Sequence, residues 1–241
     1  METQPLALVT GAAHRLGKAF VLALARNGYA ILLHYRTSDV QAANTATQIR
    51  TLGVPVFLSQ ADLSQPSQIT SLFSYVDKIP NPLKVLVNSA AIIPAGDARS
   101  ISAAEWDAVL NLNLRAPFLC AQEAAKRMKN GGLIVNITDV GAKKSWTRFP
   151  SYSVSKAGLE ALTKILARTL APSIRVNAIA PGLVLHSDLI STEEWNRLVE
   201  RLPLRRPASV DEIGSALDFL LKNEYITGQT LSIDGGYSLL G

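Results

Sequence analysis

The chain has 241 residues, of which 48% are apolar and 18% charged, and its formal net charge is +5. This composition is typical of a globular protein with a large core, and it excludes a disordered chain. Cys120 is the single cysteine, so an intrachain disulfide is excluded as well. Scattered basic residues and the lack of a leader-like or transmembrane-length segment predict a cytoplasmic protein that binds neither nucleic acid nor membranes.

The chain opens with a strand, a glycine-containing turn and a helix. Residues 6–10 are a short apolar run that ends at Gly11, and Leu16, Phe20 and Leu24 then recur at helical spacing. Glycines between a first strand and a first helix let the backbone approach a pyrophosphate, which the helix N-terminus attracts. The pattern favours a dinucleotide site over a simple tight turn. Its candidate contacts are Gly11, His14, Arg15, Leu16 and Gly17.

A second predicted strand, residues 30–33, leads into His34, Tyr35 and Arg36. In this type of fold the second strand ends beside the adenosine ribose, where an acid favours NAD and a base accommodates the 2′-phosphate of NADP. No carboxylate precedes Asp39, so the sequence predicts NADP(H), with Arg36 as a charge-assisted clamp and His34 and Tyr35 beside it. The alternative is a solvated loop arginine, and a measured preference for NADH would support it.

Helices and strands alternate along the rest of the chain. We expect helices over residues 40–52, 65–79, 103–129 and 211–221, and an amphipathic segment over 193–202. The expected strands are residues 56–59, 85–87, 133–138, 175–180 and 229–233. This alternation predicts a single α/β domain over residues 1–241, a doubly wound parallel sheet with helices on both faces. Ligands bind such sheets beyond the carboxyl ends of the strands.

Tyr152 and Lys156 are four residues apart on a further predicted helix, so both side chains lie on one face. The pKa of a free tyrosine is about 10. An adjacent ammonium stabilises the phenolate and is expected to lower this pKa toward neutrality, where general acid catalysis is most effective. The pair alone is weak evidence, because any helix can carry one, and it gains weight only from its context.

Taken together, these landmarks resemble the short-chain dehydrogenase/reductase family along nearly the whole chain. The matching motifs are the turn from Gly11 to Gly17, Asp62, Asn88-Ser89-Ala90, Asn113, Tyr152 with Lys156, Pro181-Gly182 and Asp234-Gly235-Gly236. The resemblance implies a Rossmann-like sheet of about seven strands and a homotetramer built on the helices of Asn113 and Tyr152. It also implies that Asp62 lies near the adenine, that Asn113 holds a proton-relay water and that Lys156 binds the nicotinamide ribose. Further cofactor contacts that it implies are Leu63, Asn88, Ala90, Pro181, Gly182 and Val184.

Two departures from the usual family pattern look like its pteridine reductase branch. Arg15 replaces the middle glycine of the turn, and Asp139 replaces the serine that usually stands thirteen residues before the tyrosine. The segments 34–36 and 113–118 are also similar to that branch. A serine hydroxyl suits a carbonyl oxygen, whereas a carboxyl suits a pterin, whose amino group and ring nitrogens offer donors and an acceptor that needs a proton.

The resulting hypothesis is hydride transfer from NADPH to a C=N carbon of a pteridine, with Tyr152, assisted by Asp139 and Lys156, giving the proton to nitrogen. Arg15 would bridge the pterin and a cofactor phosphate. Protozoan pteridine reductases stack an aromatic residue on the pterin where this chain has Ile93, so apolar cover remains but ring stacking does not. We expect a lid at about residues 183–208 and no metal. Further residues in segments that face the substrate are Trp146, Arg148, Leu183, His186 and Trp195.

Two alternatives remain at this point. The first is a reductase of ketone or quinone-like carbonyls that uses Asp139 in place of serine. The second is a non-catalytic NADP-binding regulator, which would be expected to have lost Tyr152 or Lys156, and the chain retains both.

Overall fold

Seven strands form one sheet in the order β3-β2-β1-β4-β5-β6-β7, and every neighbouring pair is parallel. The computed structural model describes residues 3–144, 146–187 and 189–240. The strands are β1 (Leu6–Val9), β2 (Ala30–Tyr35), β3 (Val56–Gln60), β4 (Leu83–Asn88), β5 (Gly132–Ile137), β6 (Ile174–Pro181) and β7 (Thr230–Ile233).

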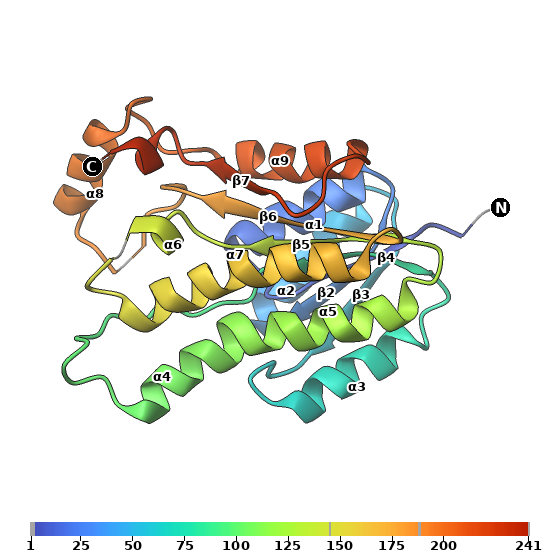
Figure 1. Cartoon of the computed structure of the whole chain (residues 1–241). Coiled ribbons are helices and arrows are strands. Elements are labelled where there is room, and N and C mark those ends of the chain that lie inside the picture. The colour runs from blue at the N-terminus through green and yellow to red at the C-terminus, as the bar shows by residue number, and fades with distance from the viewer. Residues whose placement is uncertain (1–2, 145, 188, 241) are drawn as a thin grey trace.

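Helices cover both faces of this sheet (Figure 1). One layer contains α1, α2 and α9, and the other contains α3, α5 and α7. The helices are α1 (Arg15–Arg26), α2 (Asp39–Arg50), α3 (Pro66–Val76), α4 (Ala103–Leu110), α5 (Ala116–Arg127), α6 (Gly141–Lys144), α7 (Pro150–Leu170), α8 (Thr192–Arg201) and α9 (Val210–Lys222), with a π-helical turn η1 (Asn111–Arg115) and a 3-10 turn η2 (Tyr237–Leu239).

The central strand explains why both faces need a helical layer. All four residues of β1 are buried, and successive side chains of a strand point to opposite faces. Leu6 and Leu8 accordingly belong to the core under α3, α5 and α7, whereas Ala7 and Val9 belong to the core under α1 and α9. A strand that is apolar on both sides is typical of a parallel sheet buried between helices.

The chain reverses its direction of travel across the sheet between β1 and β4. From β1 the chain builds outward to β2 and β3, then returns to place β4 on the other side of β1. The turns that follow β1 and β4 therefore separate, and a crevice opens at their carboxyl ends. This position is where doubly wound sheets bind their ligands.

The predicted fold is confirmed, and the differences concern local detail. The helix expected over 103–129 is interrupted by the π-helical turn η1, which contains Asn113, and it ends at Arg127. The short helices α6 and η2 were not expected from the sequence. Among the residues that the structure describes, no helix combines the length and the apolarity that crossing a membrane requires.

Candidate active site

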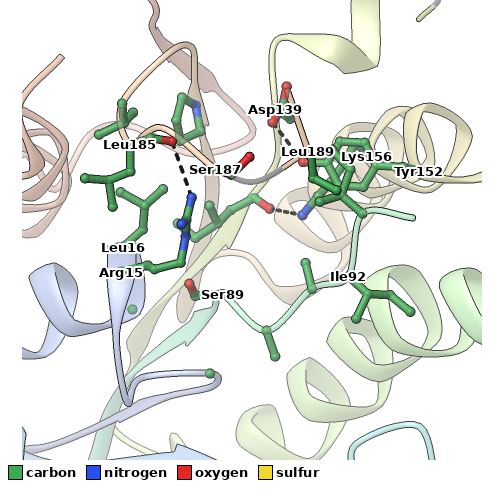
Figure 2. Close-up of a pocket in the computed structure, with 18 of the residues that line it drawn as sticks. Arg15, Leu16, Ser89, Ile92, Asp139, Tyr152, Lys156, Leu185, Ser187 and Leu189 are labelled. Atoms are coloured by element: carbon green, nitrogen blue, oxygen red, sulfur yellow. Dashed lines mark hydrogen bonds between the residues drawn. The ribbon is translucent and has the colours of Figure 1, made fainter. Parts of the chain in front are cut away.

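A cavity of about 980 Å³ lies at the carboxyl ends of the central strands (Figure 2). Its wall includes Gly11 after β1, Ala90 after β4, Asp139 after β5 and Gly182 after β6. Most of the predicted site residues line it, namely Gly11, His14, Arg15, Leu16, Gly17, His34, Tyr35, Arg36, Leu63, Ala90, Ile93, Asp139, Tyr152, Lys156, Pro181, Gly182 and Val184.

The two glycines of the turn are packed too tightly to carry a side chain. Gly11 has a φ of +64°, and a Cβ there would lie 2.9 Å from the Ala90 Cα. A Cβ on Gly17 would lie only 2.1 Å from the Gly11 carbonyl oxygen. Thr10 accepts hydrogen bonds at Oγ1 from the backbone N–H groups of Ser89 (2.9 Å) and Ala90 (3.1 Å). The turn after β1 and the loop after β4 therefore form one rigid wall.

The buried side chain of His34 holds the glycine turn in place. Its Nδ1 accepts a hydrogen bond from the Gly11 N–H (3.1 Å), so the ring proton is on Nε2 and is donated to the Ala61 carbonyl (3.0 Å). Burial lowers the pKa of His34 to about 4, because a charged imidazolium would be desolvated there. Both ring nitrogens are thus occupied by the backbone, and His34 positions the turn while its side chain also borders the cavity.

Two arginines flank the glycine turn. Arg15 has a φ of +52°, which is unusual for a residue other than glycine, and its Nη2 donates to the Leu185 carbonyl (3.4 Å; Figure 2). Arg36 follows β2, where Gln60 Nε2 donates to its carbonyl (2.8 Å). His14 is the N-cap of α1, and its side chain forms no capping hydrogen bond. The first turn of α1 therefore presents N–H groups and positive dipole to the cavity.

Asp139, Tyr152 and Lys156 converge on the other side of the cavity (Figure 2). The Tyr152 hydroxyl donates to Asp139 Oδ2 (2.8 Å), and Asp139 Oδ1 accepts from the Gly141 N–H (2.7 Å). Lys156 Nζ donates to the Ile137 carbonyl (2.7 Å) and lies 5.6 Å from the centroid of the Tyr152 ring. The end of β5 and the first turns of α7 supply all three side chains.

The ionisation of these groups differs from the sequence-based expectation. Burial raises the pKa of Tyr152 well above 10, and the Asp139 carboxyl raises it further. Burial also raises the pKa of Asp139, although its two hydrogen bonds oppose the shift. Burial lowers the pKa of Lys156 to about 8. The expected shift of the Tyr152 pKa toward neutrality is not found, because burial and the Asp139 carboxyl both favour the protonated phenol.

Three of the predicted catalytic and cofactor-binding residues lie outside the cavity wall. Asn113 accepts at Oδ1 from the Ile92 N–H (2.9 Å) and donates from Nδ2 to the Ile92 carbonyl (2.8 Å), so it ties η1 to the loop after β4. Asn88 donates to Asn136 Oδ1 (2.9 Å) within the sheet. Asp62 accepts at Oδ1 from the Ser64 N–H (2.9 Å), and hydrogen bonding to Ser64 lowers its pKa. Asn113 and Asp62 therefore hold loops next to the cavity, and Asn88 links β4 to β5.

The wall opposite the glycine turn is largely apolar. Trp146 packs edge-to-face on Phe149 (6.2 Å between centroids) and on Tyr237 (6.3 Å). Trp195 packs in the same way on His186 (5.4 Å), which is itself outside the wall. The remaining apolar residues of this wall are Ile93, Leu183, Leu185, Leu189, Ile190 and Leu198.

Sequence reasoning missed the anchoring role of Thr10 and the participation of Tyr237. Thr10 directly precedes Gly11, and a hydroxyl at that place could have signalled a side chain that caps the neighbouring loop. Tyr237 follows the closing Asp234-Gly235-Gly236 turn, and no local pattern indicates that this turn returns to the cavity. No group of histidine, cysteine, aspartate and glutamate suited to hold a metal occurs in the described part of the chain.

Known proteins with similar sequences and structures include several oxidoreductases. Residues 11–238 match the family described as enoyl-(acyl carrier protein) reductase. The 3-oxoacyl-(acyl-carrier-protein) reductase FabG of Staphylococcus aureus is 33% identical, and the match covers 98% of this chain and 99% of that protein.

Two solved structures extend the likeness to three dimensions. FolM alternative dihydrofolate reductase 1 from Brucella canis, solved in complex with NADP, has a TM-score of 0.93 at 34% identity, covering 99% of this chain and 96% of that one. A short-chain dehydrogenase/reductase from Serratia marcescens has a TM-score of 0.92 at 31% identity, and the match covers 99% of this chain and 100% of that one.

Proposed function

The chain belongs to the short-chain dehydrogenase/reductase family of oxidoreductases, and we propose that it is an NADPH-dependent reductase of a C=N bond in a pteridine. The observation that carries this proposal is the 2.8 Å hydrogen bond between Tyr152 and Asp139 at the cavity wall. It places a proton-bearing phenol beside a carboxyl, a pair that matches the mixed donors and acceptors of a pterin edge.

The residues of the glycine-turn side fit NADP(H). Gly11 and Gly17 let the turn pack closely against Ala90 and against the start of α1, and the first turn of α1 faces the cavity, where a pyrophosphate would lie. Arg36 stands where a 2′-phosphate would lie, and Arg15 adds a second positive charge. Lys156 would hold the nicotinamide ribose. The bound dinucleotide supplies a hydride to the substrate carbon, and its binding to the FolM structure supports the same choice here.

Side chains of the protein donate the proton that the reduction requires. Reduction of a C=N bond adds a hydride to carbon and a proton to nitrogen, and the Tyr152 hydroxyl holds the proton to be given. Asp139 orients that hydroxyl and can accept a hydrogen bond from the pterin amino group. The Lys156 ammonium stabilises the phenolate left behind by transfer, and the solvent returns its proton. The raised pKa of Tyr152 keeps the phenol protonated before hydride transfer.

Carbonyl reduction is the second candidate function. Ile93 covers the cavity without an aromatic ring to stack on a pterin, and the neighbouring wall is apolar enough for a ketone. The similarity to a 3-oxoacyl-(acyl-carrier-protein) reductase favours the same reading. In that case Asp139 would orient Tyr152 toward a carbonyl oxygen.

The deciding experiment follows NADPH oxidation with dihydrobiopterin, dihydrofolate, quinonoid pterins and a panel of ketones. We expect turnover of pteridines, and turnover of ketones alone would overturn the proposal. Tyr152→Phe should lower kcat by a factor of about 10²–10⁴ while NADPH still binds, because only the proton donor is removed. Tyr225→Phe is the matched control, since Tyr225 is fully exposed and outside the cavity.

Asp139→Ser tests the role of the carboxyl. Serine restores the single hydroxyl donor that suits a developing oxyanion, so the variant should prefer ketones over pteridines more than the wild type does. An unchanged preference would contradict the role assigned to Asp139, even if Tyr152→Phe behaves as expected.

We also propose that the protein is a cytoplasmic homotetramer. Phe118 on α5 and Val154 and Ile165 on α7 expose large apolar side chains, and a shallow groove between these helices is lined by Leu114 and Leu162. Exposed apolar groups of this kind are covered in many oligomers. Cys120 is buried, and the pKa of its thiol is raised to about 12, so it is poorly suited to an intersubunit disulfide. Sedimentation analysis tests the assembly.

A further inference from the structure

Arg148 is a cation on the substrate side of the cavity. The described part of the cavity wall contains four lysine and arginine residues: Arg15, Arg36, Lys156 and Arg148. The first two flank the glycine turn and the third is buried beside Tyr152, so the proposed cofactor and proton chemistry account for them. Arg148 instead neighbours the apolar wall formed by Leu189, Ile190 and Trp195, and nothing in the proposed reaction uses it.

Contacts hold the Arg148 guanidinium in place, and among the described residues some of its donors have no hydrogen-bond acceptor. Its Nη2 donates to the Leu189 carbonyl (2.7 Å), and its Cζ lies 5.5 Å from the centroid of the Phe149 ring. The Arg148 carbonyl accepts from the Gly96 N–H (3.0 Å), which fixes the backbone. The side chain is 52% exposed. A half-exposed guanidinium fixed on two sides is suited to bind an anion that enters along the cavity.

Glu194 is the charged neighbour of this guanidinium. Arg148 Nη1 lies 3.5 Å from Glu194 Oε2, which is longer than an ordinary N–H···O hydrogen bond. The pair therefore leaves the Nη1 donors available to a better-placed carboxylate. A ligand carboxylate that reaches Arg148 must also approach Glu194, so the two anions compete for one cation.

We propose that Arg148 binds a carboxylate on the tail of the substrate, so that the preferred pteridine is conjugated and folate-like and not a simple pterin. This inference rests on the proposed function, because it assumes that the pteridine ring lies beside Asp139. Trp146, Leu189 and Trp195 line the same cavity, and apolar and aromatic side chains of this kind suit the aromatic spacer that links a pterin to its carboxylates. An unconjugated pterin carries no anion to meet Arg148.

The test compares dihydrofolate, which carries carboxylates, with dihydrobiopterin, which carries none. For Arg148→Gln we expect the ratio of kcat/KM for dihydrofolate to that for dihydrobiopterin to fall about tenfold, the loss of one charge-assisted contact. For Glu194→Gln we expect the ratio to rise severalfold, because the competing anion is gone. Arg99→Gln is the matched control, since Arg99 pairs with Asp97 outside the cavity and should leave the ratio unchanged.

A binding measurement gives a readout besides activity. Calorimetry of folic acid with the NADP⁺-loaded protein should show weaker binding for Arg148→Gln and tighter binding for Glu194→Gln. If each variant changes kcat/KM for dihydrofolate and for dihydrobiopterin by the same factor, Arg148 only holds α8 against the loop before α7. That result overturns the inference. If the wild type turns over pteridines and neither variant changes the ratio, the inference alone fails. If the wild type turns over no pteridine, the proposed function fails and the inference with it.

Discussion

The two sides of the cavity are built in different ways. The glycine-turn side is made of closely packed backbone held by buried side chains. Gly11 lies against Ala90, the Thr10 hydroxyl accepts from two N–H groups, and both ring nitrogens of His34 are hydrogen-bonded. The substrate side is made of side chains on loops and on α8, a helix with no buried residue. Arg15 and Arg148 join α8 and its preceding loop to the rest through contacts with backbone carbonyls and Glu194.

This difference determines how far each side of the cavity tolerates substitution. A site formed by backbone has one shape, because any added side chain collides with atoms that cannot move. A site formed by half-exposed side chains can change its ligand by substitution at little cost in stability. Under the proposed function, the molecule combines a cofactor site of fixed shape with an adaptable substrate site. The following predictions test that contrast, beginning with the largest expected effect.

Gly17→Ala should abolish tight cofactor binding. The new Cβ would lie 2.1 Å from the Gly11 carbonyl oxygen and 2.8 Å from the Ala12 Cα, so the turn has to open. We expect NADPH affinity to fall at least about a hundredfold in a fluorescence titration, because the pyrophosphate seat is lost. A variant with wild-type affinity would show that this side of the cavity is as adaptable as the other.

Gly214→Ala is the control for this substitution. Gly214 lies in α9, and the nearest atom to its added Cβ is the Ala23 Cβ at 3.7 Å, an ordinary contact. NADPH affinity should be unchanged, and stability should rise by roughly 0.5–1 kcal/mol because alanine is the better helix former.

His34→Gln should remove a pH dependence of stability. The pKa of His34 is about 4 in the folded protein and about 6.5 in an unfolded chain, so between these values the unfolded state binds the proton first. The stabilisation is complete above pH 6.5 and is lost as the pH falls toward 4. A difference of about 2.5 pH units corresponds to roughly 3 kcal/mol. The Gln variant should be less stable at pH 7, since Gly11 loses its imidazole acceptor, but the gap should close toward pH 4.

Denaturant unfolding of the cofactor-free proteins between pH 7 and pH 4 measures this gap. His186→Gln removes an exposed imidazole on the substrate side and should keep the wild-type pH profile. If the gap between the wild type and His34→Gln stays constant with pH, His34 is not the neutral support that its two hydrogen bonds indicate.

The same contrast explains what the sequence could predict. The strand–turn–helix at Gly11 to Gly17 depends on local spacing, and the parallel sheet depends on the alternation of elements, and both were predicted. The order of the seven strands was not predicted, because it depends on how distant segments pair. His34 was predicted as a cofactor contact, but its bonds to Gly11 and Ala61 depend on how β1, β2 and β3 align. Lys156 was predicted to act on the phenol, but its bond to the Ile137 carbonyl depends on where β5 ends against α7.

The substrate side was less predictable because its members come from distant loops. Trp146, Arg148, Leu183 and Trp195 were predicted to face the substrate and do line the cavity, but Phe149, Leu198 and Tyr237 were not predicted, and they belong to three separate segments that meet only in the folded chain. The π-helical turn at Asn113 is equally non-local, since the side chain bonds to Ile92 and Ser155 rather than to its own helix. Apolar residues on loops follow no period, so sequence patterns indicate that a chamber exists but not which side chains shape it.

Trp195→Ala should have the smallest effect on folding and a clear effect on substrate. Trp195 is half-buried on α8 and packs on the exposed His186, so its loss should lower the free energy of unfolding by no more than about 1–2 kcal/mol. Phe20→Ala, in the fully buried face of α1, should cost about 3–5 kcal/mol. In steady-state kinetics Trp195→Ala should raise the KM of the accepted substrate severalfold with little change in NADPH affinity, because it widens only the adaptable substrate site. If instead Trp195→Ala destabilises the protein as much as Phe20→Ala, α8 is part of the structural core and the division into a fixed and an adaptable side is wrong.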